Sequence, residues 1–253
     1  MRIDIHQHLN FLGRNDAALI QHQKDMGIDL TVLLPSDGDD DLKASVPGPE
    51  AAYQFVSAHD GFLFAANAPP GDQETLIAYI DKGAKLIGEI KFNAPGDSPD
   101  LWSYAEVAQQ YDVPVLIHFE PILGITLDEF ATTLHRFPTV KFIGHAVQWW
   151  AQMDVTQMLL REHPNLYADV SARSGHTALS RDEEVTRNFF REFQSRILFG
   201  SDCSDPTSGR PCHGRDTLAL IEVLTDTKVR EAITYDNAAH LLKLDMTVIA
   251  PIT

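Results

Sequence analysis

The feature that most constrains the fold is a regular alternation between short apolar runs and longer amphipathic segments. The apolar runs are rich in residues that favour strands, and the segments between them have helical periodicity. Such alternation is typical of a parallel sheet whose strands are joined by crossover helices. The expected strands are Ile3-His8, Leu30-Pro35, Phe62-Ala66, Leu86-Phe92, Val115-Phe119, Lys141-His145, Leu166-Val170 and Ile197-Ser201. The expected helices are Asp16-Met26, Glu50-Ala58, Gln73-Lys82, Leu101-Tyr111, Thr126-Phe137, Val155-Glu162, Arg181-Phe193 and Arg215-Thr225.

Eight strands alternating with eight helices predict an α/β fold of the (β/α)₈ or TIM-barrel class. The length of 253 residues fits one such barrel, and no composition shift marks a second unit, so we expect a single domain over residues 1–253. A doubly wound open sheet is the alternative, because alternation alone does not prove closure. In a barrel, the loops that follow the strands form the rim that carries the active site.

The charge balance restricts the partners of the chain. It has 36 acidic against 20 basic residues and a formal net charge of -16, which repels phosphate backbones and anionic membranes. We therefore expect a small-molecule substrate and no nucleic-acid or membrane partner, while a homo-oligomer remains open. No basic run precedes an apolar stretch at the N-terminus, so we expect a cytoplasmic protein.

Two cysteines, Cys203 and Cys212, are too few for a disulfide framework, and we expect reduced thiols. Their spacing, even with His213 beside them, fits no common zinc motif, so no separate zinc site is expected there. We expect His22 to serve packing or the surface.

His6 and His8 lie two residues apart on the first expected strand, so both side chains point to the same face. The pair could grip one metal ion, but so short a pattern also arises by chance. What favours a metal site is that further ligand-type residues recur at the ends of later strands, where a barrel brings them to one rim. These residues are Glu89, His118, His145 and Asp202.

Six motifs extend over almost the whole chain: DIHQHLN, LIGEIKF, VLIHFE, FIGHA, ILFGSDC and YDNAAHLLKL. They are similar to motifs of the amidohydrolase superfamily, and within it of the amidohydrolase-related (amidohydrolase 2) group of TIM-barrel metal-dependent hydrolases and decarboxylases. The resemblance implies that His6, His8 and Asp202 hold a divalent metal, zinc before manganese or magnesium. It further implies that His118 joins them or holds a second ion. His145 then acts either as an acid or base beside one ion or as a ligand of the second.

Strand four bears on the choice between one and two ions. Glu89 matches the glutamate that bridges two ions in the DNase-like branch of the superfamily, whereas other branches carry a carboxylated lysine on this strand. Lys91 lies two residues on and faces the same way. We expect Glu89 as a ligand and Lys91 as an ammonium, ahead of a carboxylated Lys91. A salt bridge to Glu89 is the structural alternative for Lys91.

The expected activity is hydrolysis of an ester, lactone or amide bond in a small anionic molecule. A zinc ion would activate water and Asp202 would take its proton. Lys91 and Arg173 could bind a substrate carboxylate, although a surface salt bridge explains Arg173 equally well. Trp149 could form an apolar wall over the substrate, but core packing explains it better. Decarboxylation with His145 as proton donor or base is the alternative. A catalytically silent barrel is less favoured, because no expected ligand is missing.

Overall fold

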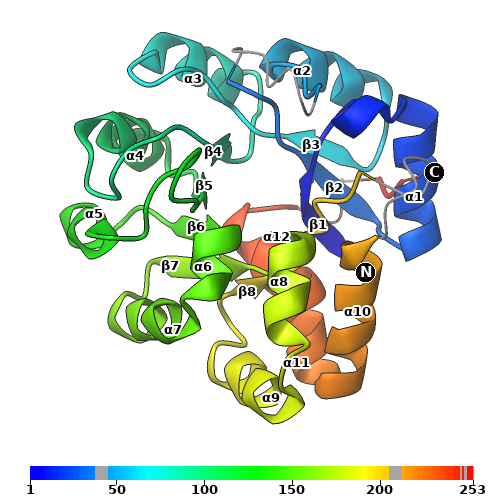
Figure 1. Cartoon of the computed structure of the whole chain (residues 1–253). Coiled ribbons are helices and arrows are strands. Elements are labelled where there is room, and N and C mark those ends of the chain that lie inside the picture. The colour runs from blue at the N-terminus through cyan, green and yellow to red at the C-terminus, as the bar shows by residue number, and fades with distance from the viewer. Residues whose placement is uncertain (38–44, 205–211, 246, 248–249, 253) are drawn as a thin grey trace.

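The parallel strands lie at the centre of the molecule, and the helices surround them (Figure 1). The computed structural model describes residues 1–37, 45–204, 212–245, 247 and 250–252. Hydrogen bonding orders the strands as β1-β2-β3 and β4-β5-β6-β7-β8. The strands are β1 (Ile3–Gln7), β2 (Leu30–Leu33), β3 (Phe62–Phe64), β4 (Ile87–Ile90), β5 (Val115–His118), β6 (Phe142–His145), β7 (Leu166–Asp169) and β8 (Ile197–Leu198).

Backbone pairing joins these two groups of strands at both seams. At one seam the amide of Ile5 donates to the carbonyl of Phe199 at 3.0 Å, which ties β1 to the chain that continues β8. At the other, Ala66 forms a parallel bridge with Ile87, which ties the end of β3 to β4. The strands therefore follow one another around a closed circle. The expected (β/α)₈ barrel is confirmed, and the open-sheet alternative is wrong.

The helices have recognisable starting signals. Asn15 accepts the amide of Ala18 at the start of α1, and Ser98 followed by Pro99 begins α4. The long helices are α1 (Asp16–Met26), α2 (Pro49–Ala58), α3 (Gln73–Asp81), α4 (Pro99–Tyr111), α7 (Met153–Glu162), α9 (Glu183–Glu192) and α10 (His213–Leu224). The short helices are η1 (Phe11–Gly13), α5 (Phe130–Arg136), α6 (Val147–Ala151), α8 (Ala172–Leu179), α11 (Thr227–Glu231), η3 (Ala232–Asp236) and α12 (Asn237–Leu241).

Several helices differ from the sequence-based expectation. Helix α5 begins at Phe130 rather than Thr126, because Ile125 pairs with Phe119 and extends the loop after β5. Helices α6 and α8 were not expected, since each is a short segment that follows a strand directly. The tail motif YDNAAHLLKL begins at the end of η3 and includes α12.

The core divides into two clusters of buried side chains. One contains side chains of β1, β2, β5, β6 and β8 together with Ala238, Leu241 and Leu242 at α12, so α12 closes one end of the barrel interior. The other contains the outward residues of the strands and the facing sides of the helices. The open end of the barrel is therefore the rim where the strands finish and the candidate site lies.

Among the described residues, none of the helices combines the length and the apolar character needed to cross a bilayer.

Candidate functional site

His6 and His8 face each other at the end of β1. The register between β1 and β2 shifts here, because Asp4 pairs with Thr31 but Gln7 with Leu33, so β1 carries one extra residue. Such irregularities re-aim side chains and are common beside active sites. The Nε2 atoms of His6 and His8 lie 3.2 Å apart.

The other nitrogen of each ring fixes its protonation. Nδ1 of His8 donates to the carbonyl of Leu34 at 2.7 Å, which can only accept, and Nδ1 of His6 lies 2.7 Å from a carboxylate oxygen of Asp169. When both rings are neutral, each Nε2 therefore carries a lone pair, and the two lone pairs point at each other. Two such lone pairs repel unless a cation lies between them. The pair therefore fits a metal ion, and the hydrogen bonds from Nδ1 of each ring already hold the two rings in position.

Asp202 completes the first group of ligand-type atoms. Its carboxylate lies 3.4 Å from Nε2 of His8 and 3.9 Å from Nε2 of His6. Its amide donates to the carbonyl of His6 at 2.8 Å, so the same backbone seam that closes the barrel also positions this side chain. Asp202 has a left-handed φ of 46°, a costly conformation that functional sites often retain.

Glu89 stands between this group and a second one. Its Oε2 lies 3.7 Å from Nε2 of both His6 and His8, while its Oε1 contacts Nδ1 of His118 and lies 3.3 Å from Nε2 of His145. The register of β4 against β5 shifts beside Glu89, as it does beside His6. Nε2 of His145 is buried and has no hydrogen-bond partner among the described residues. One carboxylate therefore faces two clusters of nitrogen ligands.

Burial and neighbouring charges shift the pKa values of the ionisable groups in the site. Burial alone would raise the pKa of Glu89, but His118, His145 and His6 outweigh it and hold that pKa well below its usual range. Burial would also raise the pKa of Asp202, and His6 and His8 outweigh it and lower that pKa. Both carboxylates are therefore ionised at neutral pH. Burial, followed by the charge of His6, lowers the pKa of His145, so its imidazole is neutral.

His6 behaves in the opposite way. Burial alone would lower the pKa of its imidazole, but Asp202 and Asp169 outweigh burial and raise that pKa well above its usual value. A position that attracts a proton this strongly also attracts a metal cation, because both respond to the same surrounding carboxylates.

Asp169 and Ser171 are site residues that sequence reasoning missed. Both are fully buried, and the hydroxyl of Ser171 donates to Asp169 at 2.7 Å and lies 2.8 Å from Nδ1 of His145. They connect His6 to His145 beneath the ligand groups. The signal was present in the sequence, since Asp169 is a charged residue at the end of an apolar strand, as Asp202 is.

The residues expected to contact substrate differ in how far they are buried. Lys91 and Arg173 are exposed after β4 and at the start of α8, and neither forms an ion pair among the described residues. The salt bridge between Lys91 and Glu89 is therefore absent from the part of the chain that the structure describes. Trp149 is fully buried and lies over Gly144 and Phe119, which favours its packing role. Glu120 lies 3.1 Å from Nε2 of His118.

The histidine and cysteine side chains outside this site also pair up. His213 stacks on His176, with ring centroids 5.7 Å apart, and takes no part with the cysteines. Cys203 and Cys212 instead meet each other and His22, which is buried rather than on the surface. The expectation of a packing or surface role for His22 overlooked its sulfur partner.

The fold recurs in known enzymes. A TatD homolog from Escherichia coli K12 superposes with a TM-score of 0.64 at 15% identity, covering 96% of this chain and 98% of that one. A Pseudomonas putida protein provisionally assigned as a 2-pyrone-4,6-dicarboxylic acid hydrolase gives 0.66 at 14% identity, with 96% and 98% covered. A 2,6-dihydroxybenzoate decarboxylase from Rhizobium gives 0.65 at 15% identity, with 96% and 99% covered. At such identities these likenesses support the fold alone.

No curated protein matches this sequence closely enough to be counted as a relative. A family model does match: the one described as Amidohydrolase aligns with residues 3–244, which include every ligand-type residue of the site. The resemblance seen in the sequence motifs is thereby confirmed, and this chain belongs to the Amidohydrolase family.

Proposed function

We propose that this chain is a metal-dependent hydrolase that directs water at an ester, lactone or amide bond of a small anionic substrate. The observation that carries the proposal is the pair of facing Nε2 atoms of His6 and His8, 3.2 Å apart and flanked by the ionised carboxylate of Asp202. These atoms suit a divalent ion of the zinc type, with manganese or magnesium as alternatives.

In this proposal His6, His8 and Asp202 would hold one ion. Glu89, His118 and His145 would hold a second ion, or His145 would act as a base beside a single ion. When bound, such an ion polarises a substrate carbonyl and makes water a stronger acid.

The protein groups supply the proton handling and the binding. Asp202, ionised by its histidine neighbours, accepts the proton of the attacking water. Neutral His145 suits a ligand or a base better than an acid, and a base at this position serves hydrolysis and the alternative decarboxylation alike. Lys91 and Arg173, exposed at the rim, bind the substrate anion.

Metal content tests the ligand assignment. We expect Glu89→Gln to lower the number of ions per chain in elemental analysis, because it removes the carboxylate between the two groups. The matched control is Glu106→Gln on the exposed side of α4, which should leave the metal content unchanged. An unchanged content in Glu89→Gln would contradict its role as a ligand.

Chelation and product analysis test the reaction. Activity on a panel of anionic esters, lactones and amides should vanish with chelator and return with Zn²⁺ or Mn²⁺. A metal-free preparation with full activity would exclude the mechanism. Release of CO₂ from carboxylated aromatic substrates, without hydrolysis of the panel, would identify a decarboxylase instead.

A further inference from the structure

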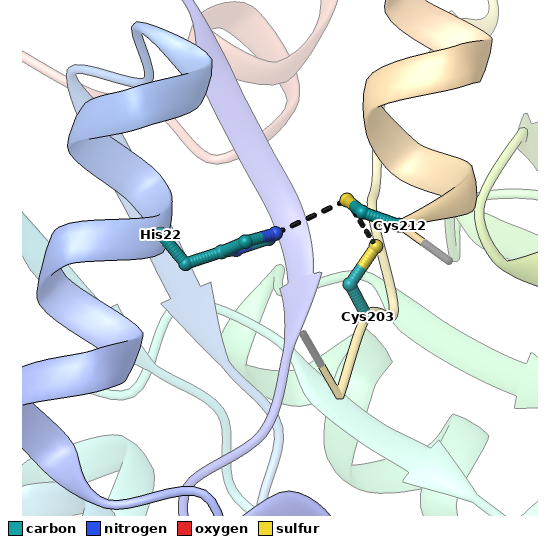
Figure 2. Close-up of side chains that lie close together, drawn as sticks. All are labelled: His22, Cys203 and Cys212. Atoms are coloured by element: carbon teal, nitrogen blue, oxygen red, sulfur yellow. Dashed lines mark hydrogen bonds between the residues drawn. The ribbon is translucent and has the colours of Figure 1, made fainter. Parts of the chain in front are cut away.

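A second cluster of metal-ligand side chains lies behind the rim, between α1, α10 and the loop after β8 (Figure 2). The sulfurs of Cys203 and Cys212 lie 2.9 Å apart, and Nε2 of His22 lies 3.1 Å from the sulfur of Cys212. Figure 2 shows the three side chains pointing toward one another from these separate elements. Their ligand atoms all lie within 4.8 Å of one another.

We propose that His22, Cys203 and Cys212 bind a thiophilic metal ion, Zn²⁺ or Cu⁺, at a site separate from the one that contains His6 and His8. Adjacent residues of the chain, Asp202 and Cys203, belong to different sites. The side chain of Asp202 faces His6 and His8, whereas that of Cys203 faces the first turn of α10. The expectation of no zinc site at these cysteines considered only His213, and the third ligand comes instead from a helix far away in the sequence.

Backbone amides donate to the sulfurs of both cysteines. The amide of Gly214 donates to the sulfur of Cys203 at 3.3 Å, and the amide of Arg215 donates to the sulfur of Cys212 at 3.4 Å. Both donors belong to the first turn of α10, whose N-terminus carries partial positive charge. Two anionic sulfurs in contact repel each other, and a cation between them removes that cost.

A fourth soft ligand is within reach. Met26 lies one turn after His22 on the same face of α1, and its sulfur is 3.7 Å from that of Cys212. Two thiolates, an imidazole and a thioether select soft or borderline ions over Mg²⁺, Mn²⁺ or Ca²⁺. The donor set therefore differs in kind from the nitrogen and oxygen ligands at the rim.

A disulfide between Cys203 and Cys212 is the competing outcome. Such a disulfide would leave the buried imidazole of His22 without a role. Yet Nε2 of this ring points at the sulfur of Cys212, and its Nδ1 has no hydrogen-bond partner among the described residues. A zinc ion with Zn–S bonds of about 2.3 Å holds two sulfurs about 3.7 Å apart. The two sulfurs now lie 2.9 Å apart, so the cysteine side chains would rotate apart to hold the ion.

Cobalt substitution separates this site from the rim. Thiolate ligands give Co²⁺ an intense near-ultraviolet charge-transfer absorption that nitrogen and oxygen ligands do not give. We expect this absorption in the reduced full-length protein, its loss in Cys212→Ser and in His22→Asn, and its retention in His6→Asn. The matched control is His163→Asn, since His163 and His22 are both 4% exposed. Absence of the absorption in the wild type, or its survival in Cys212→Ser, would overturn the proposal.

Thiol reactivity gives a second readout that needs no variant. With Zn²⁺ at about ten times its dissociation constant, alkylation of the two thiols should slow about tenfold, because only the metal-free fraction reacts. An anaerobic Cu⁺ competition titration then shows which of the two ions binds more tightly. Unprotected thiols, or loss of two hydrogens by mass in the zinc-loaded protein, would overturn the site. Neither outcome bears on the hydrolase proposal, whose ligands contain no sulfur.

Discussion

At the scale of single residues, Asp169 and Ser171 stand out because neither is among the expected ligands. Asp169 accepts from Nδ1 of His6, and Ser171 links Asp169 to His145. Each fixes which ring nitrogen is left free to face the centre of the site. They are positioning residues, and their effect should appear in metal affinity.

We expect Asp169→Asn to weaken metal binding by about 10- to 100-fold, the usual cost of removing a carboxylate behind a histidine ligand. The amide keeps the size of the side chain but loses the charge that holds His6 in place. Competition with a chromophoric chelator measures the change. Asp25→Asn on the exposed side of α1 serves as the control, and equal affinity in the two variants would refute the role of Asp169.

Gly200 provides a steric test of the same contacts. A Cβ atom there would lie 2.5 Å from a carboxylate oxygen of Asp169 and 2.7 Å from Cβ of His6. Gly200→Ala should therefore lower both metal affinity and the free energy of unfolding, the latter by about 1–3 kcal/mol.

The control for Gly200 is Gly96→Ala, which creates comparable clashes with Thr126 and Phe130 away from the ligands. It should reduce stability alone. If both variants kept normal metal affinity when folded, close packing of Gly200 against His6 would have no functional meaning.

At the scale of secondary structure, several site residues lie in or beside strained turns that follow the strands. Ala146 directly follows His145 and adopts φ 84° and ψ -164°, a region that is essentially restricted to glycine. Asp202 and Ala172 also have positive φ. Short turns of this kind connect β6 directly to α6 and Ser171 directly to α8. Because no long loop intervenes, His145 and Ser171 are held at the strand ends.

Ala146→Gly should raise the free energy of unfolding by about 0.5–1 kcal/mol, because relief of the strain exceeds the added entropy of the unfolded chain. Chemical denaturation of the metal-free protein measures it. The control is Ala219→Gly on the exposed side of α10, where the same substitution should lower the free energy of unfolding by about 1 kcal/mol. Destabilisation of similar size in both variants would mean that Ala146 is not strained.

The sequence predicted these elements well and their irregularities poorly. Period and composition locate all eight strands, and the ligand types at their ends point to one rim. The extra residue in β1 beside His6, and the shift in β4 beside Glu89, have no signature in a single chain, because register is set by the neighbouring strand. The meeting of His22 with Cys212 was missed for the same reason, since it depends on how α1 and α10 pack.

At the scale of the whole molecule, the candidate site connects strands from all round the barrel. His6 and His8 come from β1, Glu89 from β4, His118 and His145 from β5 and β6, and Asp202 from beyond β8. An ion held by these residues links segments that are distant in the sequence. Binding to the folded state alone therefore stabilises the entire barrel.

We expect metal removal to lower the unfolding temperature. At an ion concentration of about 100 times the dissociation constant, binding contributes about 2.7 kcal/mol, which corresponds to roughly 5–11 °C for a chain of this size. Calorimetry with and without chelator measures the shift. The same chelator should cause a smaller shift in His6→Asn, where only the site at His22, Cys203 and Cys212 can still lose an ion. An equal shift in that variant would locate the stabilising ion elsewhere.

The hydrogen bond from the amide of Asp202 to the carbonyl of His6 joins the first strand of the barrel to the segment after the last. During synthesis His6 and His8 precede Asp202 by the seven strands β2 to β8. Until Asp202 joins them, the two histidines can bind metal only weakly. Loading of the ion is therefore one of the last events of folding, and a metal-loaded chain is one whose barrel has already closed.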